Sequence, residues 1–194
     1  MKIILATHNE HKIKEIRKIL KNKGLKILSL TDFSQKIRFI ENGKTFEENA
    51  IIKAKKVAKE LNMTAVADDS GLCVDALNGK PGVKSARFVR PPATNTKLCH
   101  KLLKVMKGFP HGKRSAHFVC AVAIAWPDGK IRAVEGIVSG DIIDEMKGSC
   151  GFGYDSVFVP SGFDITFAQM TQRQKNSLSH RGRAFKKAKK LLSL

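Results

Sequence analysis

The stretch "LATHNEHK" (5–12) joins an apolar run to a polar turn and the start of a helix. A strand that leads into a helix in this way predicts free backbone N–H groups and the positive end of the helix dipole at one point, which suits a phosphate group. Asn9 and Lys12 stand one helical turn apart, so both side chains are expected to face the same anion. An ordinary N-cap followed by a solvated lysine is the alternative interpretation of this stretch.

Acidic residues gather before and after the segment 45–61, although this chain has only 17 Asp and Glu against 36 Lys and Arg. Carboxylate oxygens are the protein ligands that Mg²⁺ prefers, and this ion usually keeps several waters when it binds phosphates. Asp69, expected at the end of a strand, is well placed to hold a metal ion or to activate water. Glu47 and Glu48 are explained by the helix start, whereas Glu41 has no such structural role. Lys53, on the same helix, is predicted to reach a phosphate.

Two further stretches carry candidate functional groups. In "GFGYDSVF" (151–158) the glycines allow close backbone approach, and Phe152 and Tyr154 offer flat faces for a base; a tight turn in a sheet is the alternative. The triplet Ser179-His180-Arg181 opens a very basic segment whose later lysines, 186–190, indicate a solvated helix face.

The elements that must position these residues follow from hydrophobic periodicity and turn signals. Amphipathic helices are expected after residue 9, ending at Gly24, over 45–61 behind a Thr45–Glu48 capping box, and after Thr94. Strands are expected over 2–7, 25–30, 64–70 (running into an acidic turn), 115–126 and 131–142, the last two forming a hairpin around the turn 127–130. This alternation predicts a mixed-sheet α/β protein.

Composition limits the class of protein. The chain has 194 residues, 42% of them hydrophobic, which is enough for one domain spanning 1–194. A membrane-spanning helix needs about 18 consecutive apolar residues, and no apolar run in this sequence approaches that length. The four cysteines are widely spaced, which favours free thiols in a reducing, cytoplasmic setting. The net charge of +19 favours anionic partners. Aromatic residues are sparse in the basic runs, so no specific nucleic acid is expected.

Five motifs occur in a characteristic order: "ATHNEHK" (6–12), "TFEENAIIKA" (45–54), "ADDSGLCVDALNGKPGVKSAR" (67–87), "GFGYDSVFVP" (151–160) and "KNSLSHRGRA" (175–184). Together they resemble the inosine triphosphate pyrophosphatase family, whose members hydrolyse dITP, ITP and XTP to the monophosphate and pyrophosphate. The resemblance extends from Leu5 to Ala184.

The resemblance implies a strongly curved mixed sheet flanked by helices, with two lobes and the active-site cleft between them, a homodimer, and Mg²⁺ as cofactor. It implies that Asp69 is metal ligand and proton acceptor, and that a glutamate is the second metal ligand, which is Glu41 or comes from elsewhere in the chain. Many relatives carry paired acids where this chain has Ile40-Glu41, and Ser156 replaces a proline usual after "GFGYD". The implied substrate-binding residues are Thr7, His8, Asn9, Glu10, His11, Lys12, Lys53, Ser70, Phe152, Gly153, Tyr154, Asp155, Lys175, His180 and Arg181.

Within this set, Asn9 and Lys12 are the implied triphosphate contacts, and the segment 152–155 is the implied wall for the base. His180 and Arg181 would recognise the purine at its sixth position, with Ser179 as the helix cap that orients them. Two alternatives stay open: a Maf-like nucleotide pyrophosphatase, against which the "SHRG" and "GFGYD" motifs argue, and a basic nucleic-acid-binding protein.

Overall fold

A computed structural model describes residues 1–34 and 37–193 of the chain. The strands found there form one sheet in the order β2-β1-β3-β4-β5-β6. β1 pairs in parallel with β2 and with β3, whereas β5 and β6 are antiparallel, so the sheet is mixed. The strand bounds are Lys2–Leu5 (β1), Lys26–Ser29 (β2), Ala65–Val74 (β3), Ser115–Ala125 (β4), Ile131–Ile142 (β5) and Phe158–Pro160 (β6).

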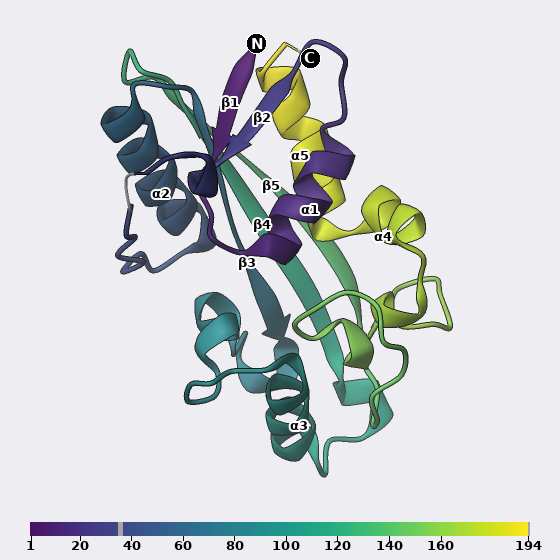
Figure 1. The fold of residues 1–194 in the computed structure, drawn as a ribbon. Coiled ribbons are helices and arrows are strands. Elements are labelled where there is room, and N and C mark those ends of the chain that lie inside the picture. Colours follow the sequence, from purple (N-terminus) through teal and green to yellow (C-terminus); the bar gives the residue numbers. More distant parts are fainter. Residues whose placement is uncertain (35–36, 194) are drawn as a thin grey trace. The chain divides into compact units, whose positions relative to one another are not determined.

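Helices flank this sheet, and five α-helices lie in the described residues (Figure 1). Their bounds are Glu10–Ile19 (α1), Phe46–Leu61 (α2), Asn95–Met106 (α3), Gln172–Leu178 (α4) and His180–Leu191 (α5). The predicted α/β class with a mixed sheet and flanking helices is therefore confirmed. Within the described residues, no helix has both the length and the apolar character that crossing a membrane requires.

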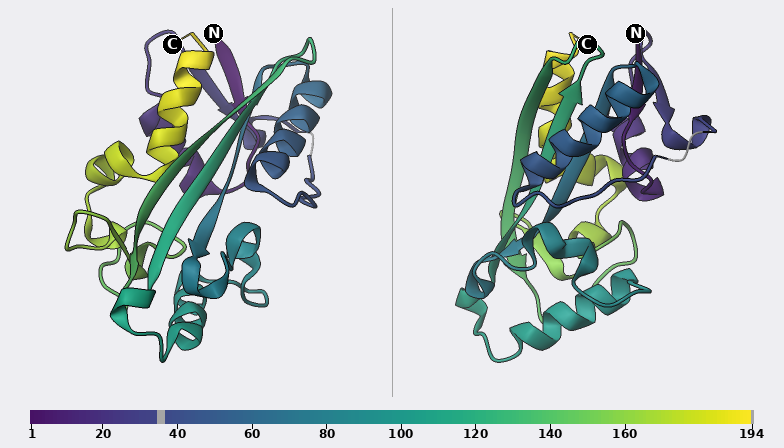
Figure 2. Two further views of the ribbon diagram at one scale, coloured as in Figure 1. Left: turned by 180° about the vertical axis from the view of Figure 1, so that it is seen from behind. Right: turned by 90° about the vertical axis from the view of Figure 1, so that its left-hand side faces the viewer.

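The chain divides into two compact units. Unit 1 comprises Met1–Asp69, Cys120–Gly136 and Arg181–Leu194, and unit 2 comprises Ser70–Val119 and Ile137–His180. The long strands β4 and β5 are joined by the short turn 127–130, which requires that they run antiparallel (Figure 2). The predicted single domain, and the predicted cleft between two lobes, concern how these units combine and stay predictions.

In unit 1, helices cover both faces of the strands. On one face, Ile13 and Ile16 of α1 and Phe185 of α5 pack in one buried cluster with Val66 of β3. Helix α2 lies on the opposite side (Figure 1). Since successive residues of a strand point to opposite faces, neighbouring residues of β3 serve different helices.

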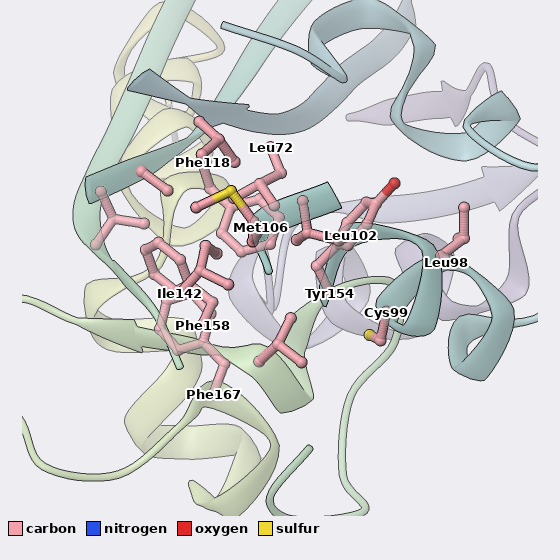
Figure 3. Close-up of a cluster of buried hydrophobic side chains, with 14 of the residues drawn as sticks. Leu72, Leu98, Cys99, Leu102, Met106, Phe118, Ile142, Tyr154, Phe158 and Phe167 are labelled. Atoms are coloured by element: carbon pink, nitrogen blue, oxygen red, sulfur yellow. The ribbon is translucent and has the colours of Figure 1, made fainter. Parts of the chain in front are cut away.

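Unit 2 is built around a second buried cluster, which α3 and the strand ends share (Figure 3). Leu98 and Leu102 of α3 lie inside it, as the helical spacing predicts, and Thr94 caps that helix by accepting from the N–H of Lys97. The labelled aromatic members are Phe118, Tyr154, Phe158 and Phe167. The rings of Phe118 and Phe158 meet edge to face with centroids 4.8 Å apart.

Three local predictions are wrong. The acidic turn after residue 67 does not exist, because β3 continues without a break to Val74 and Asp69 lies inside the strand. Helix α1 ends at Ile19, where the backbone turns at Leu20, well before Gly24. The capping box at α2 is incomplete, because the carboxylate of Glu48 accepts from the N–H of Lys44 rather than from that of Thr45.

The cysteines are free thiols, as predicted. Cys99 and Cys120 are buried, Cys73 is half-buried and Cys150 is exposed. Burial raises the pKa of the Cys99 and Cys120 thiols, which leaves both largely protonated near neutral pH.

Candidate functional site

Two adjacent aspartates of β3 each hold a lysine from a different helix of unit 1. Asp68 and Asp69 point to opposite faces of the strand. On one face Asp68 contacts Lys12 of α1, with 3.1 Å between the carboxylate and the ammonium. On the other face Asp69 contacts Lys53 of α2 at 2.9 Å. The alternation of the strand therefore separates two carboxylate–ammonium pairs.

The Asp69 side chain accepts two hydrogen bonds in a nearly buried setting. Lys53 Nζ donates to Asp69 Oδ1 and also to Glu41 Oε1, at 2.8 Å, while Asn49 Nδ2 donates to Asp69 Oδ2 at 3.3 Å. Burial raises the pKa of Asp69 above its ordinary value, and Lys53 only partly opposes this. Burial would lower the pKa of Lys53, but Asp69, Asp68 and Glu41 raise it, so the ammonium stays charged.

Asp68 has a different environment, because two cations share one of its oxygens. Arg181 of α5 donates to Asp68 Oδ2 from Nη2 at 3.0 Å and from Nε at 3.3 Å, beside the contact from Lys12. Arg181 also donates from Nη1 to Glu15 Oε2 of α1 at 2.7 Å. Burial alone would raise the pKa of Asp68, but Lys12 and Arg181 overcome it and hold the pKa far below its ordinary value. Asp68 therefore stays ionised near neutral pH.

The predicted metal ligands, Glu41 and Asp69, converge on one cation. Their carboxylates both accept from the Lys53 ammonium, which stands where a positive charge between them would bind. In the described residues no group of three or more His, Cys, Asp or Glu side chains is arranged around one point as a metal cage. Carboxylate oxygens are the ligands that Mg²⁺ takes in phosphate sites, so the donor set of Glu41 and Asp69 fits this ion.

The start of α1 differs from the prediction of free N–H groups. Asn9 is the N-cap, and its Oδ1 accepts from the N–H groups of His11 at 3.0 Å and Lys12 at 3.2 Å. The N–H of Asn9 itself donates to Thr7 Oγ1 at 3.2 Å. The N-cap interpretation of this turn is therefore correct for the Asn9 side chain. Lys12 is nevertheless no solvated lysine, because only 13% of its side chain is exposed.

His8 connects this turn to the segment that carries Glu41. Its Nε2 lies 2.8 Å from the backbone oxygen of Ile37, and its ring lies 5.4 Å from that of Phe39. Ile37 is buried, which anchors the segment in unit 1. The remaining residues predicted in this turn, Glu10 and His11, are both largely exposed.

In unit 2 the predicted base wall is organised by a buried ion pair. Lys175 Nζ donates to Asp155 Oδ2 at 2.6 Å, and the same oxygen accepts from the N–H of Phe152 at 2.7 Å. The Lys175 ammonium also lies over the Phe152 ring, 5.1 Å from its centroid. Gly151 has φ +78, and a Cβ there would collide with the Asp155 carboxylate, so this turn requires glycine.

The other predicted members of the wall have structural contacts. The N–H of Gly153 donates to Asn95 Oδ1 at 2.9 Å, which ties the loop to the first turn of α3. Tyr154 does not present an open face, because its ring is buried in the core cluster and its hydroxyl donates to the backbone oxygen of Ser85 at 2.8 Å (Figure 3). Ser70, which follows Asp69 on β3, is half-buried.

The triplet 179–181 is buried throughout. Ser179 immediately precedes α5, in the position of the predicted cap. The His180 ring stacks on Phe118 in unit 2, with centroids 4.6 Å apart and an interplanar angle of 9°. Arg181 lies in unit 1 and engages Asp68 and Glu15 as described above. Its role in reading the base stays a prediction.

Sequence reasoning assigned no role to the partners that hold these groups, which are Glu15, Asn49, Asp68 (recognised only as one of the gathered acidic residues) and Asn95. Glu15 carried a detectable signal, since it lies beside the apolar positions of α1 and only one turn after Lys12. Asp68 carried another, because it precedes Asp69 in a strand. Asn49 and Asn95 are polar residues in first helical turns, where no spacing distinguishes them from solvated ones.

Solved structures of other proteins have the same fold as this chain. A Staphylococcus aureus Ham1 protein superposes with a TM-score of 0.89 at 37% identity, covering 100% of this chain and 98% of that one. A nucleoside-triphosphatase / dITP/XTP pyrophosphatase from Mycobacterium abscessus gives a TM-score of 0.79 at 41% identity, covering 97% and 98%. The fold is thus that of an α/β class whose solved members include a protein named nucleoside-triphosphatase / dITP/XTP pyrophosphatase.

The sequence comparison is equally extensive. The Ham1 family model matches residues 3–191, and the chain belongs to this family. It is 46% identical over 193 residues to the dITP/XTP pyrophosphatase of Desulforamulus reducens, covering 100% of this chain and 96% of that protein. It is 44% identical over 189 residues to the protein of that name from Bacillus subtilis, covering 97% and 96%. The resemblance stated from the motifs is confirmed, and these names do not favour the Maf-like or the nucleic-acid-binding alternative.

Proposed function

We propose that this protein hydrolyses deaminated purine nucleoside triphosphates, namely dITP, ITP and XTP, to the monophosphate and pyrophosphate. The observation that carries the proposal is the pair of nearly buried lysines, Lys12 and Lys53, each held by one carboxylate of β3. Nearly buried ammonium groups suit a polyanion better than solvated ones, because their attraction is weakly screened. The full-length similarity to proteins named dITP/XTP pyrophosphatase supports the same substrate class.

Asp69 is the proposed proton acceptor. A water molecule attacks the α-phosphorus and gives its proton to the Asp69 carboxylate, while the bond from that phosphorus to the oxygen bridging to the β-phosphate breaks. The pyrophosphate leaves with the electron pair, and Lys12 and Lys53 offset its charge. The raised pKa of Asp69, caused by burial, makes its carboxylate a stronger base than an exposed aspartate.

Glu41 and Asp69 are the proposed ligands of Mg²⁺. The ion, when bound, would polarise the phosphate oxygens and lower the pKa of the attacking water. Lys53 contacts both carboxylates, and its proposed role is to bind the phosphates beside these two ligands.

The proposed base recognition belongs to unit 2. Phe152, under the Lys175 ammonium, offers a face for stacking, and His180 is the proposed donor to the base. Hypoxanthine and xanthine carry an acceptor oxygen at the sixth position, whereas adenine carries a donor amino group. A buried donor that meets another donor can reject the wrong base by ~10⁴-fold or more, so ATP is expected to be a poor substrate.

We further propose a cytoplasmic homodimer. The free cysteines are consistent with a reducing compartment. The homodimer follows from the family resemblance, and light scattering of the purified protein measures it directly: a single species of about twice the chain mass is expected.

The deciding experiment is a panel of nucleoside triphosphates assayed for pyrophosphate release with Mg²⁺ present and absent. We expect rapid release from dITP, ITP and XTP with Mg²⁺, and little from ATP or pyrimidine nucleotides. Orthophosphate release, or equal rates on all bases, would contradict the proposal. A salt titration separates the nucleic-acid-binding alternative, because counterion release weakens that binding steeply while hydrolysis at a small site falls modestly.

A further inference from the structure

The side chain of Asp68 is fully buried, and the proposed reaction does not use it. One of its oxygens, Oδ2, forms ion pairs with Lys12 and Arg181. Its other oxygen, Oδ1, is buried and has no hydrogen-bond partner in the described part of the chain. Buried polar atoms without a hydrogen-bond partner are uncommon in native proteins and call for an explanation.

The geometry around Lys12 indicates what the Asp68 carboxylate does through its Oδ2 oxygen. In the described residues Asp68 is the one carboxylate that contacts the Lys12 ammonium. Lysine has several rotatable bonds and loses considerable rotamer freedom when it is fixed, so a partner is needed to hold it in one place. Asp68 is itself fixed by a contact with the Arg181 guanidinium. Arg181 also donates to Glu15, which lies one turn after Lys12 on α1.

We propose that Asp68 is a positioning residue: with Arg181 as its support, it aims the Lys12 ammonium at the triphosphate. This rests on the proposed triphosphate role of Lys12. The two adjacent aspartates of β3 then divide the work. Asp69 takes part in the reaction, whereas Asp68 acts through Lys12 and touches neither substrate nor metal.

A double-mutant cycle on the binding of inorganic tripolyphosphate, measured by calorimetry, tests this. Asp68→Asn, Lys12→Ala and the double variant are compared with the wild type. If Asp68 acts through Lys12, Asp68→Asn weakens binding by about tenfold or more when Lys12 is present, and by less than about twofold when Lys12 is absent. Charge alone predicts the opposite sign, because removing an anion should tighten binding of a polyanion.

A second cycle provides the specificity control. Asp68→Asn combined with Lys53→Ala should keep most of its effect, because Lys53 pairs with Asp69 on the other face of β3 and interacts with Asp68 only through its charge, without a direct ion pair. Asp128→Asn, in the exposed turn between β4 and β5, is the matched substitution that should leave binding unchanged. The KM and kcat for ITP are measured on the same variants, and the loss in Asp68→Asn should divide between KM and kcat in the same proportion as the loss in Lys12→Ala.

Asp68→Glu covers the case in which Asp68→Asn does not fold, since it keeps the charge but moves the carboxylate by one methylene. It should also weaken tripolyphosphate binding only when Lys12 is present. Tighter binding, equal losses with and without Lys12, no binding by the wild type, or the failure of both variants to fold would each overturn the proposal. Coupling in tripolyphosphate binding without ITP hydrolysis would instead overturn the proposed function and leave this inference standing.

Discussion

Asp69→Asn separates the chemistry of Asp69 from its contribution to the fold. The substitution keeps the size of the side chain and one oxygen that can accept from Lys53, but removes the negative charge and the basicity. It leaves Lys53 with one carboxylate, Glu41, at 2.8 Å. The two consequences differ in size, and this difference makes the variant informative.

The stability term should be small. Breaking a buried ion pair costs about 3–5 kcal/mol when a charge is left uncompensated. Here Lys53 keeps Glu41, and the raised pKa of Asp69 indicates that burial already disfavours its charge. We therefore expect the free energy of unfolding to fall by no more than about 1–2 kcal/mol, the scale of one hydrogen bond.

The catalytic term should be large. Loss of a general base lowers kcat by about 10²–10⁴-fold, which corresponds to about 3–5 kcal/mol in the barrier. Pyrophosphate release from ITP measures kcat, and urea unfolding of the same preparations measures stability. Asp128→Asn, in an exposed turn, is the control and should match the wild type in both assays. A well-folded Asp69→Asn enzyme with near-wild-type kcat would refute the assignment of Asp69 as proton acceptor.

Three other predictions follow from the same geometry. Lys12→Ala and Lys53→Ala should each lower kcat/KM for ITP by at least about tenfold, since a charge-assisted contact contributes about 1.5–3 kcal/mol. Lys187 is exposed, so Lys187→Ala should change kcat/KM little. Equal losses in Lys187→Ala and Lys12→Ala would contradict the phosphate-binding role of Lys12. Arg181→Ala should lower the free energy of unfolding, measured in urea, by about 3–5 kcal/mol, because two buried carboxylates lose their shared cation. If Arg181 reads the base, the same variant should lose more activity with ITP than with ATP. Tyr154 is the single tyrosine, and burial raises its pKa, so absorbance at the tyrosinate band should show no ionisation near pH 10 in the native protein. The contribution of the neutral Tyr154 side chain to stability is complete below the pKa of the unfolded state and is lost as the pH rises above that value. Titration of the folded protein near pH 10 would show that the ring is not buried.

Local pattern was enough for most elements of the fold. The apolar positions of α1 and α3 lie inside as their helical spacing predicts, and β4, apolar at successive positions, is buried along nearly its whole length. Periodicity records which side of an element is apolar, and this depends on residues only a few positions apart. The error at Asp69 has the same origin. Two consecutive aspartates resemble a turn, and only their buried partners allow them to continue a strand.

The candidate site was predictable where it depended on residue type and motif, and not where it depended on distant partners. The motifs alone point to Lys12, Lys53 and Asp69, because each carries a charge at a helix or strand position that suits a phosphate or a metal ion. The buried position of Tyr154 was not predictable, because an aromatic ring in a glycine-rich loop is compatible with both an open wall and a core.

The sequence by itself determined that a strand begins near residue 64, with successive residues on opposite faces, and that a basic helix begins near residue 180. Only the tertiary structure decided which helix covers each face, and hence that Asp68 meets Arg181, 113 positions along the chain, while Arg181 meets Glu15, 166 positions away. The physical reason is that alternation and periodicity arise from local backbone geometry. The partner of a buried charge, in contrast, is selected by the packing of the whole of unit 1.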